Sequence, residues 1–400
     1  MRVTLATGVG LLTLATALVA GSDPSEAAFP PGDNGQIAFT RTDGGDDDIF
    51  AMEADGSNPV NLTSASTLGD QNAVFSPNAS TILFQSNRDG DTDLYTMGTD
   101  GSNPVNLTPT STENDYQPTY FPDGRIAFTR NDPPPGGDAD IFTMNADGSN
   151  PVNLTAAFPG NDVNANVSPD GSRIAFGSNR DGGDQDIFVM GADGSNPVNL
   201  TSANTTADQN PAFSPNPHTI VFQRLVAAGN SDIFVMGADG SNPVNLTSAN
   251  TTPDIQPSFS PDVTRILFTR TDGGDQDIFV MGADGSAPVN LTAGNTTSDR
   301  EASWQSLQFC GGRQATIVGT LGNDKLTGTK QADVMVGLDG NDKINGKGGK
   351  DRECGGDGKD KLKGGGGNDK LFGDEGKDNL DGGGGTDKLR GGPGKDKQEQ

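Results

Sequence analysis

The most regular chemical feature of this chain is an aspartate that recurs every nine residues near the C-terminus: Asp324, Asp333, Asp342, Asp351, Asp360, Asp369, Asp378, Asp387 and Asp396. Five residues before each aspartate stands a glycine: Gly319, Gly328, Gly337, Gly346, Gly355, Gly364, Gly373, Gly382 and Gly391. Glycines also occur two residues before most of the aspartates, and Gly358, Gly367, Gly376 and Gly385 of this set are candidate site residues. Glycines allow sharp turns that aim backbone carbonyl oxygens inward. Carboxylate and carbonyl oxygens are the ligands that Ca²⁺ takes in sets of six to eight.

An aliphatic residue follows most of these aspartates by two positions: Leu326, Met335, Ile344, Leu362, Leu371, Leu380 and Leu389. The full pattern resembles G-G-x-G-x-D-x-U-x, the calcium-binding nonapeptide of RTX proteins. The resemblance implies a parallel β-roll in which two nonapeptides make one turn and calcium lies between loops 18 residues apart. Each ion then needs two neighbouring loops of one stack, so nine repeats allow at most seven Ca²⁺ ions.

Three positions depart from this pattern. Gln331 replaces a turn glycine, and Glu353 and Gln398 replace aliphatic residues in the fourth and last repeats. Because so few apolar residues cannot offset the conformational entropy of the chain, we expect this segment to be disordered without calcium and to fold as its sites fill. Cys310 and Cys354 are the only cysteines. In an exported protein they predict a disulfide, which would compensate for the core residue lost beside Cys354.

A longer period of 45 to 47 residues positions a second set of motifs. Strings related to DIFVM begin at Asp48, Asp93, Asp140, Asp186, Asp232 and Asp277, and each is followed by a string related to DGSNPVNLT. One copy contains four short β-type runs, at 165–168, 173–176, 186–190 and 197–201, separated by Asp-Gly turns. Four strands in about 45 residues are typical of a propeller blade. Six copies therefore predict an all-β, six-bladed β-propeller.

The ends of the repeat region predict how the propeller closes. The first copy begins at Gln36 and lacks its first strand, whereas 302–304 supplies an additional strand after the sixth copy, with Trp304 in the position that Phe75 occupies in the second copy. The last strand would then complete the first blade and remove the open sheet edges. The strings SPDG, SNRDG, DIFVM and DGSNPVNLT resemble the WD40-like (PD40) β-propeller repeat of the TolB family.

Several polar residues of the propeller repeat have more than one reading. One aspartate recurs seven residues after each VNLT threonine: Asp70, Asp115, Asp162, Asp208, Asp254 and Asp299. Each of these residues either caps its own turn or contributes to a ring of carboxylates at the channel mouth that binds a cation or a basic ligand. The acidic loops at 43–48 and 89–93 resemble calcium loops but lack the terminal bidentate glutamate. The Asn-Leu-Thr strings fit a glycosylation acceptor, although their place on a repeated strand favours a structural role. His218 is the only histidine and falls in a turn, which argues against a catalytic triad.

The charge is divided sharply along the chain. Residues 310–400 carry 16 acidic and 16 basic residues, whereas residues 1–309 carry 38 acidic residues, 11 Arg and no Lys, and so account for the whole net charge of −27. This shift predicts a domain boundary near residue 310, between a propeller at 28–309 and a calcium-binding β-roll at 310–400. An acidic propeller argues against nucleic acid and anionic membranes as partners.

The first 27 residues have the features of a secretory signal peptide. A short basic start precedes an apolar segment at 3–20, and small residues offer cleavage after Ser22 or Ala27. The alternative is an uncleaved anchor, since about 18 apolar residues could just span a bilayer. We expect cleavage, no transmembrane segment in the mature chain, and a secreted, extracellular or cell-envelope location.

These features favour a secreted calcium-binding protein whose propeller is a non-catalytic interaction platform, with an extracellular or envelope protein or glycan as partner and the chain as a monomer. Two alternatives remain. One is an extracellular enzyme with a carboxylate–metal site at the propeller channel mouth, and the other is an envelope adhesin or scaffold. Against catalysis, the blades are nearly identical, whereas an active site breaks such symmetry. The least regular loops, at 131–137 and 225–229, would be the places to look for one.

Overall fold

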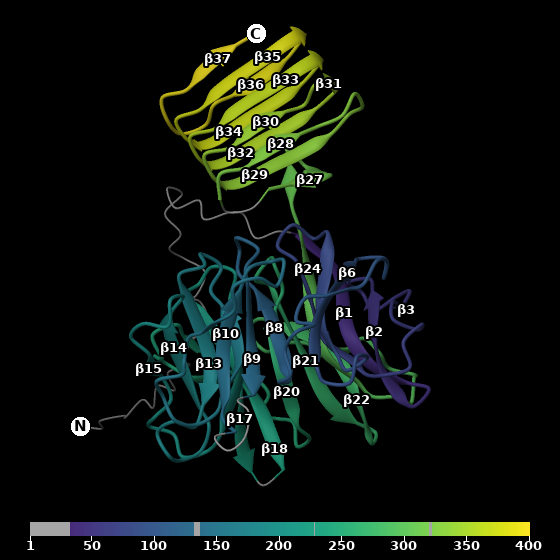
Figure 1. Ribbon diagram of the computed structural model, residues 1–400, viewed down its shortest axis with the longest axis vertical. Helices are drawn as coiled ribbons and strands as arrows, with labels where there is room; N and C mark the ends of the chain where they lie inside the picture. Colours follow the sequence, from purple (N-terminus) through teal and green to yellow (C-terminus); the bar gives the residue numbers. More distant parts are fainter. Residues whose placement is uncertain (1–32, 132–136, 228, 320–321) are drawn as a thin grey trace, which may run out of the picture. The chain divides into compact units, whose positions relative to one another are not determined.

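A computed structural model describes residues 33–131, 137–227, 229–319 and 322–400. The predicted signal peptide lies outside the described residues. Strands β1 to β24 form the propeller and strands β27 to β37 form a parallel solenoid (Figure 1). In the described part of the chain, no helix is long and apolar enough to cross a membrane.

Six four-stranded antiparallel sheets make the blades of the propeller within the described residues. The second to fourth blades contain β4 (Asp70–Phe75), β5 (Thr81–Ser86), β6 (Asp93–Gly98), β7 (Val105–Asn106); β8 (Asp115–Tyr120), β9 (Ile126–Asn131), β10 (Ala139–Met144), β11 (Val152–Asn153); and β12 (Asp162–Val167), β13 (Arg173–Ser178), β14 (Asp186–Gly191), β15 (Val198–Asn199). The fifth and sixth contain β16 (Asp208–Phe213), β17 (Thr219–Ala227), β18 (Asn230–Gly237), β19 (Val244–Asn245); and β20 (Asp254–Phe259), β21 (Arg265–Asp272), β22 (Asp275–Gly282), β23 (Val289–Asn290).

The first blade confirms the predicted closure. Its order is β24-β1-β2-β3, formed by β24 (Asp299–Leu307), β1 (Asp33–Asp43), β2 (Asp46–Met52) and β3 (Val60–Asn61). Trp304 pairs with Ile37 across the closing strands, as Phe75 pairs with Ile82 in the second blade. The chain ends of the propeller are thereby held in one sheet, which leaves no unpaired inner edge at the junction.

The apolar core of the propeller lies between adjacent blades. Ile37, Phe39 and Trp304 of the first blade pack with Leu267 and Ile278 of the sixth. The other face of the first blade packs against the second blade in the same way. Because period-two strands present one side to each neighbour, every blade shares its two faces with two different cores.

The C-terminal solenoid consists of two parallel sheets whose strands pair with a constant offset of 18 residues. One sheet contains β27 (Ile317–Val318), β29 (Val334–Gly340), β32 (Arg352–Gly358), β34 (Lys370–Gly376) and β36 (Lys388–Arg390). The other contains β28 (Lys325–Thr327), β30 (Lys343–Asn345), β33 (Lys361–Gly367), β35 (Asn379–Gly385) and β37 (Lys397–Glu399), with β31 (Gly348–Gly349) also beside β33. The fold is therefore the expected all-β propeller followed by a parallel β-roll of two nonapeptides per turn.

The core of the solenoid is a thin column of the predicted aliphatic residues. Met335, Ile344, Leu362, Leu371 and Leu380 are almost fully buried. A disulfide joins Cys354 in β32 to Cys310 in β25 (Phe309–Cys310), which pairs with β26 (Arg313–Gln314). The predicted pairing of the two cysteines is therefore confirmed.

Candidate metal centre

The nine aspartates of the nonapeptides form two stacks along the solenoid, in which equivalent residues are 18 positions apart. One stack contains Asp324, Asp342, Asp360, Asp378 and Asp396, and the other contains Asp333, Asp351, Asp369 and Asp387. In each stack the Oδ1 atom of one aspartate accepts the backbone N–H of the preceding one, at 2.8 to 3.1 Å. These bonds lock one carboxylate oxygen of each acceptor and fix the orientation of the other.

The second oxygen of the central aspartates has no hydrogen-bond partner in the described structure. This holds for Oδ2 of Asp342, Asp351, Asp360, Asp369 and Asp378, whose side chains are buried. An unpaired buried carboxylate oxygen is energetically costly, because it has lost its water without gaining a donor. Five such oxygens in successive repeats indicate a position for a positively charged group.

The glycine that precedes each aspartate by five residues lets the free oxygen approach the backbone closely, because a side chain there would clash with it. A Cβ atom on Gly337 would lie 2.3 Å from both Oδ2 of Asp342 and the carbonyl oxygen of Gly355. A Cβ atom on Gly355 would meet Oδ2 of Asp360 at 2.4 Å and the carbonyl oxygen of Gly373 at 2.7 Å. At each such glycine, one carboxylate oxygen and one carbonyl oxygen of the next turn therefore lie close together.

The second turn glycines have a different role, which is to let consecutive turns stack closely. Gly358, Gly367, Gly376 and Gly385 have φ between 139° and 145°, in the region that favours glycine. A Cβ atom on any of them would fall within 1.7 Å of a carbonyl oxygen in the turn before. Gly394 behaves in the same way, with a carbonyl oxygen 1.6 Å from its Cβ position, and Gly340 does so less tightly, at 2.5 Å, although neither was among the site residues predicted from the sequence.

The electrostatics of the solenoid favour a bound cation. Burial raises the pKa of Asp342, Asp351 and Asp378 to about 6 and that of Asp360 to about 7, and neighbouring carboxylates add to the effect. The pKa of Asp369 is raised by the same causes. Without a counter-charge the ionised stack is therefore unfavourable, and a divalent cation would remove this penalty.

An acidic ladder that sequence reasoning missed lies beside the first aspartate stack. Asp339, Asp357 and Glu375 pair in register in strands β29, β32 and β34. Burial and, to a smaller extent, the neighbouring carboxylate of Asp357 together raise the pKa of Asp339 to about 6. Like charges in adjacent register positions repel. The 18-residue spacing of these three residues was the signal that could have revealed them.

The donor set fits calcium rather than a softer metal. Within the described residues, no group of three or more His, Cys, Asp or Glu side chains is placed to hold a metal. The enclosing atoms are instead single carboxylates combined with backbone carbonyls, which is the hard, all-oxygen environment that Ca²⁺ accepts. The acidic propeller loops at 43–48 and 89–93 lie among the residues searched and form no such group.

The second repeat differs from the others in its free oxygen. Thr329 donates both its backbone N–H, at 2.6 Å, and its hydroxyl, at 3.0 Å, to Oδ2 of Asp333. This oxygen is already satisfied, so a cation would have to compete with Thr329 for it. The repeat with the substituted turn residue Gln331 is thus also the one whose carboxylate has an internal partner.

The recurring propeller aspartates do not form a ring of free carboxylates, so that reading is wrong, whereas hydrogen bonds from turn asparagines to Asp208, Asp254 and Asp299 agree with the structural, turn-capping reading. Each is the first residue of an innermost strand, is fully buried, and pairs with an arginine at 2.5 to 2.7 Å: Asp70 with Arg88, Asp115 with Arg130, Asp162 with Arg180, Asp208 with Arg224, Asp254 with Arg270 and Asp299 with Arg41. Each guanidinium also lies 4.7 to 5.4 Å from two aromatic ring centroids of its blade. These clusters are structural.

Amides line the centre of the propeller in place of those aspartates. Each innermost strand has a register shift at one residue with positive φ: Asn72, Gln117, Asn164, Asn210, Gln256 and Glu301. All six line one central cavity. Glu301 accepts hydrogen bonds from the hydroxyl of Thr40 at 2.8 Å and the backbone N–H of Asn72 at 3.0 Å, and burial raises its pKa.

The other repeated polar residues of the blades also have internal partners. Asn153 donates to Oδ2 of Asp140 at 2.8 Å, Thr155 donates to Oδ1 of the same residue at 2.8 Å, and the other blades repeat this arrangement. This supports the structural role expected for the Asn-Leu-Thr strings. His218 is exposed in the bend between β16 and β17.

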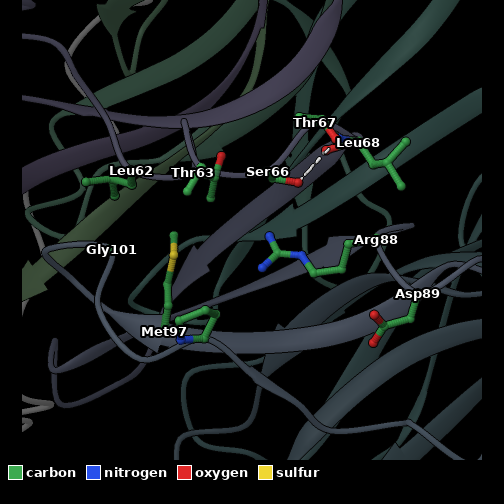
Figure 2. A pocket seen from close by; sticks show the side chains of 11 residues that line it. Leu62, Thr63, Ser66, Thr67, Leu68, Arg88, Asp89, Met97 and Gly101 are labelled. Carbon is green, nitrogen blue, oxygen red and sulfur yellow. Dashed lines mark hydrogen bonds between the residues drawn. The ribbon is translucent and has the colours of Figure 1, made fainter.

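A surface pocket is lined by residues of the first two blades, and several of its polar side chains have internal hydrogen-bond partners. It is lined by residues that include Thr63, Ser66, Arg88, Asp89 and Met97 (Figure 2). Arg88 is bound to Asp70, Asp89 accepts the hydroxyl of Tyr95, and Ser66 donates to the carbonyl of Leu68 at 2.9 Å. The chemistry of the chain is therefore concentrated in the solenoid.

Fold and site together define an all-β protein with a six-bladed propeller and a calcium-type parallel solenoid. Models of protein families agree: the TolB β-propeller domain (PD40) matches residues 116–222 and 199–307, and the RTX calcium-binding nonapeptide repeat matches residues 318–353 and 355–389. The chain thus carries a PD40/TolB-like β-propeller domain followed by RTX hemolysin-type calcium-binding repeats. Repeats of this type bind Ca²⁺ and are typical of secreted proteins.

Several solved structures are similar to this chain over about two thirds of its length. TolB from Acinetobacter baumannii shares 21% identity over 68% of this chain and 66% of its own, with a TM-score of 0.60. A putative TolB from Agrobacterium tumefaciens shares 20% over 68% and 92%, with a TM-score of 0.53, and hydrazine synthase of Kuenenia stuttgartiensis shares 15% over 69% and 47%, with a TM-score of 0.60. These similarities show the fold. No curated protein matches the chain.

Proposed function

We propose that this chain is a secreted calcium-binding protein in which the solenoid is a calcium-stabilised module and the propeller is a non-catalytic interaction platform. The observation that carries the proposal is the row of unpartnered Oδ2 atoms of Asp342, Asp351, Asp360, Asp369 and Asp378. Each of these oxygens lies near a carbonyl oxygen of the next turn, beside a glycine at which a side chain would clash with both. Several ions, at most seven, would fit between turns of the two stacks.

The glycines and aspartates named above would hold the ions with carboxylate and carbonyl oxygens. Calcium would supply the positive charge that the buried carboxylates lack. Filling the sites would then contribute directly to the folding free energy of the solenoid, because a site made of two turns does not exist in the unfolded chain. The disulfide between Cys310 and Cys354 would lower the entropy of the unfolded segment and assist this folding.

The alternative of an enzyme with a carboxylate–metal site at the channel mouth has less support. The six aspartates that suggested it are held by arginines, and the residues that line the central cavity include one carboxylate, Glu301, among amides. A propeller whose polar residues are internally paired suits binding through its surface, with an extracellular or envelope protein or glycan as the partner.

Calcium titration of the purified, chelator-treated full chain tests the proposal. We expect several Ca²⁺ ions to bind, with Mg²⁺ at the same concentration unable to replace them, and a gain of β signal in circular dichroism. Absence of binding at millimolar calcium would contradict the proposal. Envelope-protein and glycan pull-downs with and without calcium test the platform role, and cell fractionation separates a free secreted protein from an adhesin or scaffold.

A further inference from the structure

Glu353 is a glutamate in the aliphatic column of the solenoid. In the parallel register of β29, β32 and β34 it lies between Met335 and Leu371, both of which are fully buried. Its own side chain has an exposed fraction of 0%. The position therefore combines the burial of a core residue with a group that strongly prefers water or a counter-charge.

Neither carboxylate oxygen of Glu353 has a hydrogen-bond partner in the described structure. None of the basic side chains described in the solenoid pairs with it: the ion pairs there join Lys363 to Asp381 and Lys397 to Glu399. A completely buried carboxylate with no donor and no counter-charge is unfavourable. Something that the protein chain does not itself supply is needed to balance it.

The carboxylate of Glu353 is directed at one of the glycine positions described above. A Cβ atom on Gly346 would lie 2.3 Å from Oδ2 of Asp351, 2.7 Å from the carbonyl oxygen of Gly364 and 2.8 Å from Oε1 of Glu353. Oδ2 of Asp351 is also without a partner. Three oxygens, two of them from separate carboxylates, therefore lie close to one another between the fourth and sixth repeats.

The neighbouring positions of the same stack lack this third oxygen. Around Gly328 the nearest oxygens are Oδ2 of Asp333 and the carbonyl of Gly346, and around Gly364 they are Oδ2 of Asp369 and the carbonyl of Gly382. The difference arises from Glu353, because the equivalent position one turn later is occupied by Leu371, whose side chain has no oxygen.

We propose that Glu353 is a calcium ligand outside the nonapeptide pattern, which completes a site with Asp351 and the carbonyl oxygen of Gly364 and makes this site the tightest of the solenoid. Two carboxylates balance the charge of one Ca²⁺ ion, and calcium affinity rises with the number of charged ligands and the rigidity of the site. The adjacent Cys354 is anchored by its disulfide, which restrains the strand that carries Glu353. This site is then the first to fill and the start of calcium-dependent folding.

This inference rests on the proposed calcium function, and the experiment is chosen to separate the two. Stepwise Ca²⁺ titration by calorimetry is carried out on the full chain with Glu353→Gln, Glu353→Leu and the wild type. Glu399→Gln serves as a control that removes one exposed carboxylate of the same solenoid. Hydrogen exchange of peptides covering 346–369 and 319–342 is followed at increasing calcium concentrations.

We expect both Glu353 variants to weaken the tightest binding step at least tenfold and to leave the weaker steps unchanged, while Glu399→Gln binds like the wild type. In the wild type, residues 346–369 should gain protection at lower calcium than residues 319–342, and this order should be lost in Glu353→Gln. Glu353→Leu restores the aliphatic pattern, so misfolding does not explain its loss of affinity. If the dissociation constant of the tightest binding step in both Glu353 variants is within twofold of the wild-type value, this inference alone is overturned. If the wild type binds no calcium, the proposed function is overturned as well.

Discussion

Replacement of Gly367 by alanine is a direct test of how the turns of the solenoid stack. Gly367 has a φ of 145°, and a Cβ atom there would lie 1.5 Å from the carbonyl oxygen of Gly349 in the turn before. Its neighbour Gly366 provides a matched control. A Cβ atom on Gly366 would have its nearest contact with the carbonyl oxygen of Lys347, at 3.9 Å.

The magnitude follows from these distances. Ordinary van der Waals contact begins near 3.4 Å, so the two turns would have to separate locally by about 1.9 Å. The hydrogen bond from Gly366 N–H to the carbonyl of Lys347, now 2.9 Å, would then be broken. An alanine forced into this backbone region costs about 1–3 kcal/mol, and each lost backbone hydrogen bond costs about 0.5–1.5 kcal/mol. A total of about 3 kcal/mol corresponds to roughly a 100-fold change in an equilibrium constant.

Hydrogen exchange of the full chain during calcium titration measures this effect. Because binding and folding of the solenoid are coupled, we expect Gly367→Ala to lower the folding equilibrium constant about 100-fold at a given calcium concentration, and so to raise the calcium concentration that protects residues 343–385 by up to about 100-fold, and by less when several ions bind together. Gly366→Ala should stay within about threefold of wild type, since its methyl group meets no backbone atom at close range. If the two variants titrate alike, the close stacking of turns does not control the calcium-loaded fold and the reasoning is wrong.

Three further predictions concern other parts of the chain. Asp162→Ala leaves the nearly buried guanidinium of Arg180 unpaired and should lower propeller stability by about 3–5 kcal/mol in urea unfolding. The control Asp123→Ala breaks an exposed pair with Arg125 and should cost less than about 1 kcal/mol. Equal losses of stability would contradict the structural role of the buried pairs. Burial and the carboxylates of Asp351 and Asp369 raise the pKa of Glu353 to about 8, and burial raises the pKa of Asp360 to about 7. The folded, calcium-free solenoid therefore binds more protons than the unfolded chain. Its stability should fall as pH rises from about 4 to 8. Calcium that binds to the folded solenoid must displace these protons, so apparent affinity should then fall from pH 8 to pH 5 with measurable proton release; a pH-independent affinity would show that calcium binds to an unfolded segment whose carboxylates are already ionised. The double variant Cys310→Ser/Cys354→Ser removes a link across 44 residues, worth about 4 kcal/mol in loop entropy, and should raise the calcium concentration needed for folding, as circular dichroism would report.

Much of the fold could be predicted because each motif occurs many times. The strand runs of one propeller copy were placed within a few residues, although the innermost strand begins at Asp162 rather than at Ala165 and the outermost contains only Val198–Asn199. The closing position of Trp304 and the pairing of Cys310 with Cys354 also followed from position in the sequence. In these cases local residue types and spacing carried the information.

The residues of the candidate site could be predicted from the sequence, but which of their carboxylate oxygens accept hydrogen bonds could not. The period of nine identified the aspartates, yet the hydrogen bond that occupies Oδ1 of Asp342 comes from Asp324 in another turn, and Thr329 satisfies Oδ2 of Asp333. Likewise, the propeller aspartates looked like a ring of free carboxylates because the arginine partner of each lies in a different strand, as Arg180 does for Asp162.

The sequence by itself determined the all-β architecture, the two repeat periods and the position of the calcium-type repeats, because strands and turns depend on residue types close together in the chain. Only the tertiary structure decided which carboxylates are free to bind a cation. Asp162 and Glu353 are both buried acidic residues, but the first pairs with an arginine, whereas the second lies near Oδ2 of Asp351 and the carbonyl oxygen of Gly364. The reason is that the electrostatic balance of a buried group depends on atoms brought near by folding, and sequence spacing alone does not specify them.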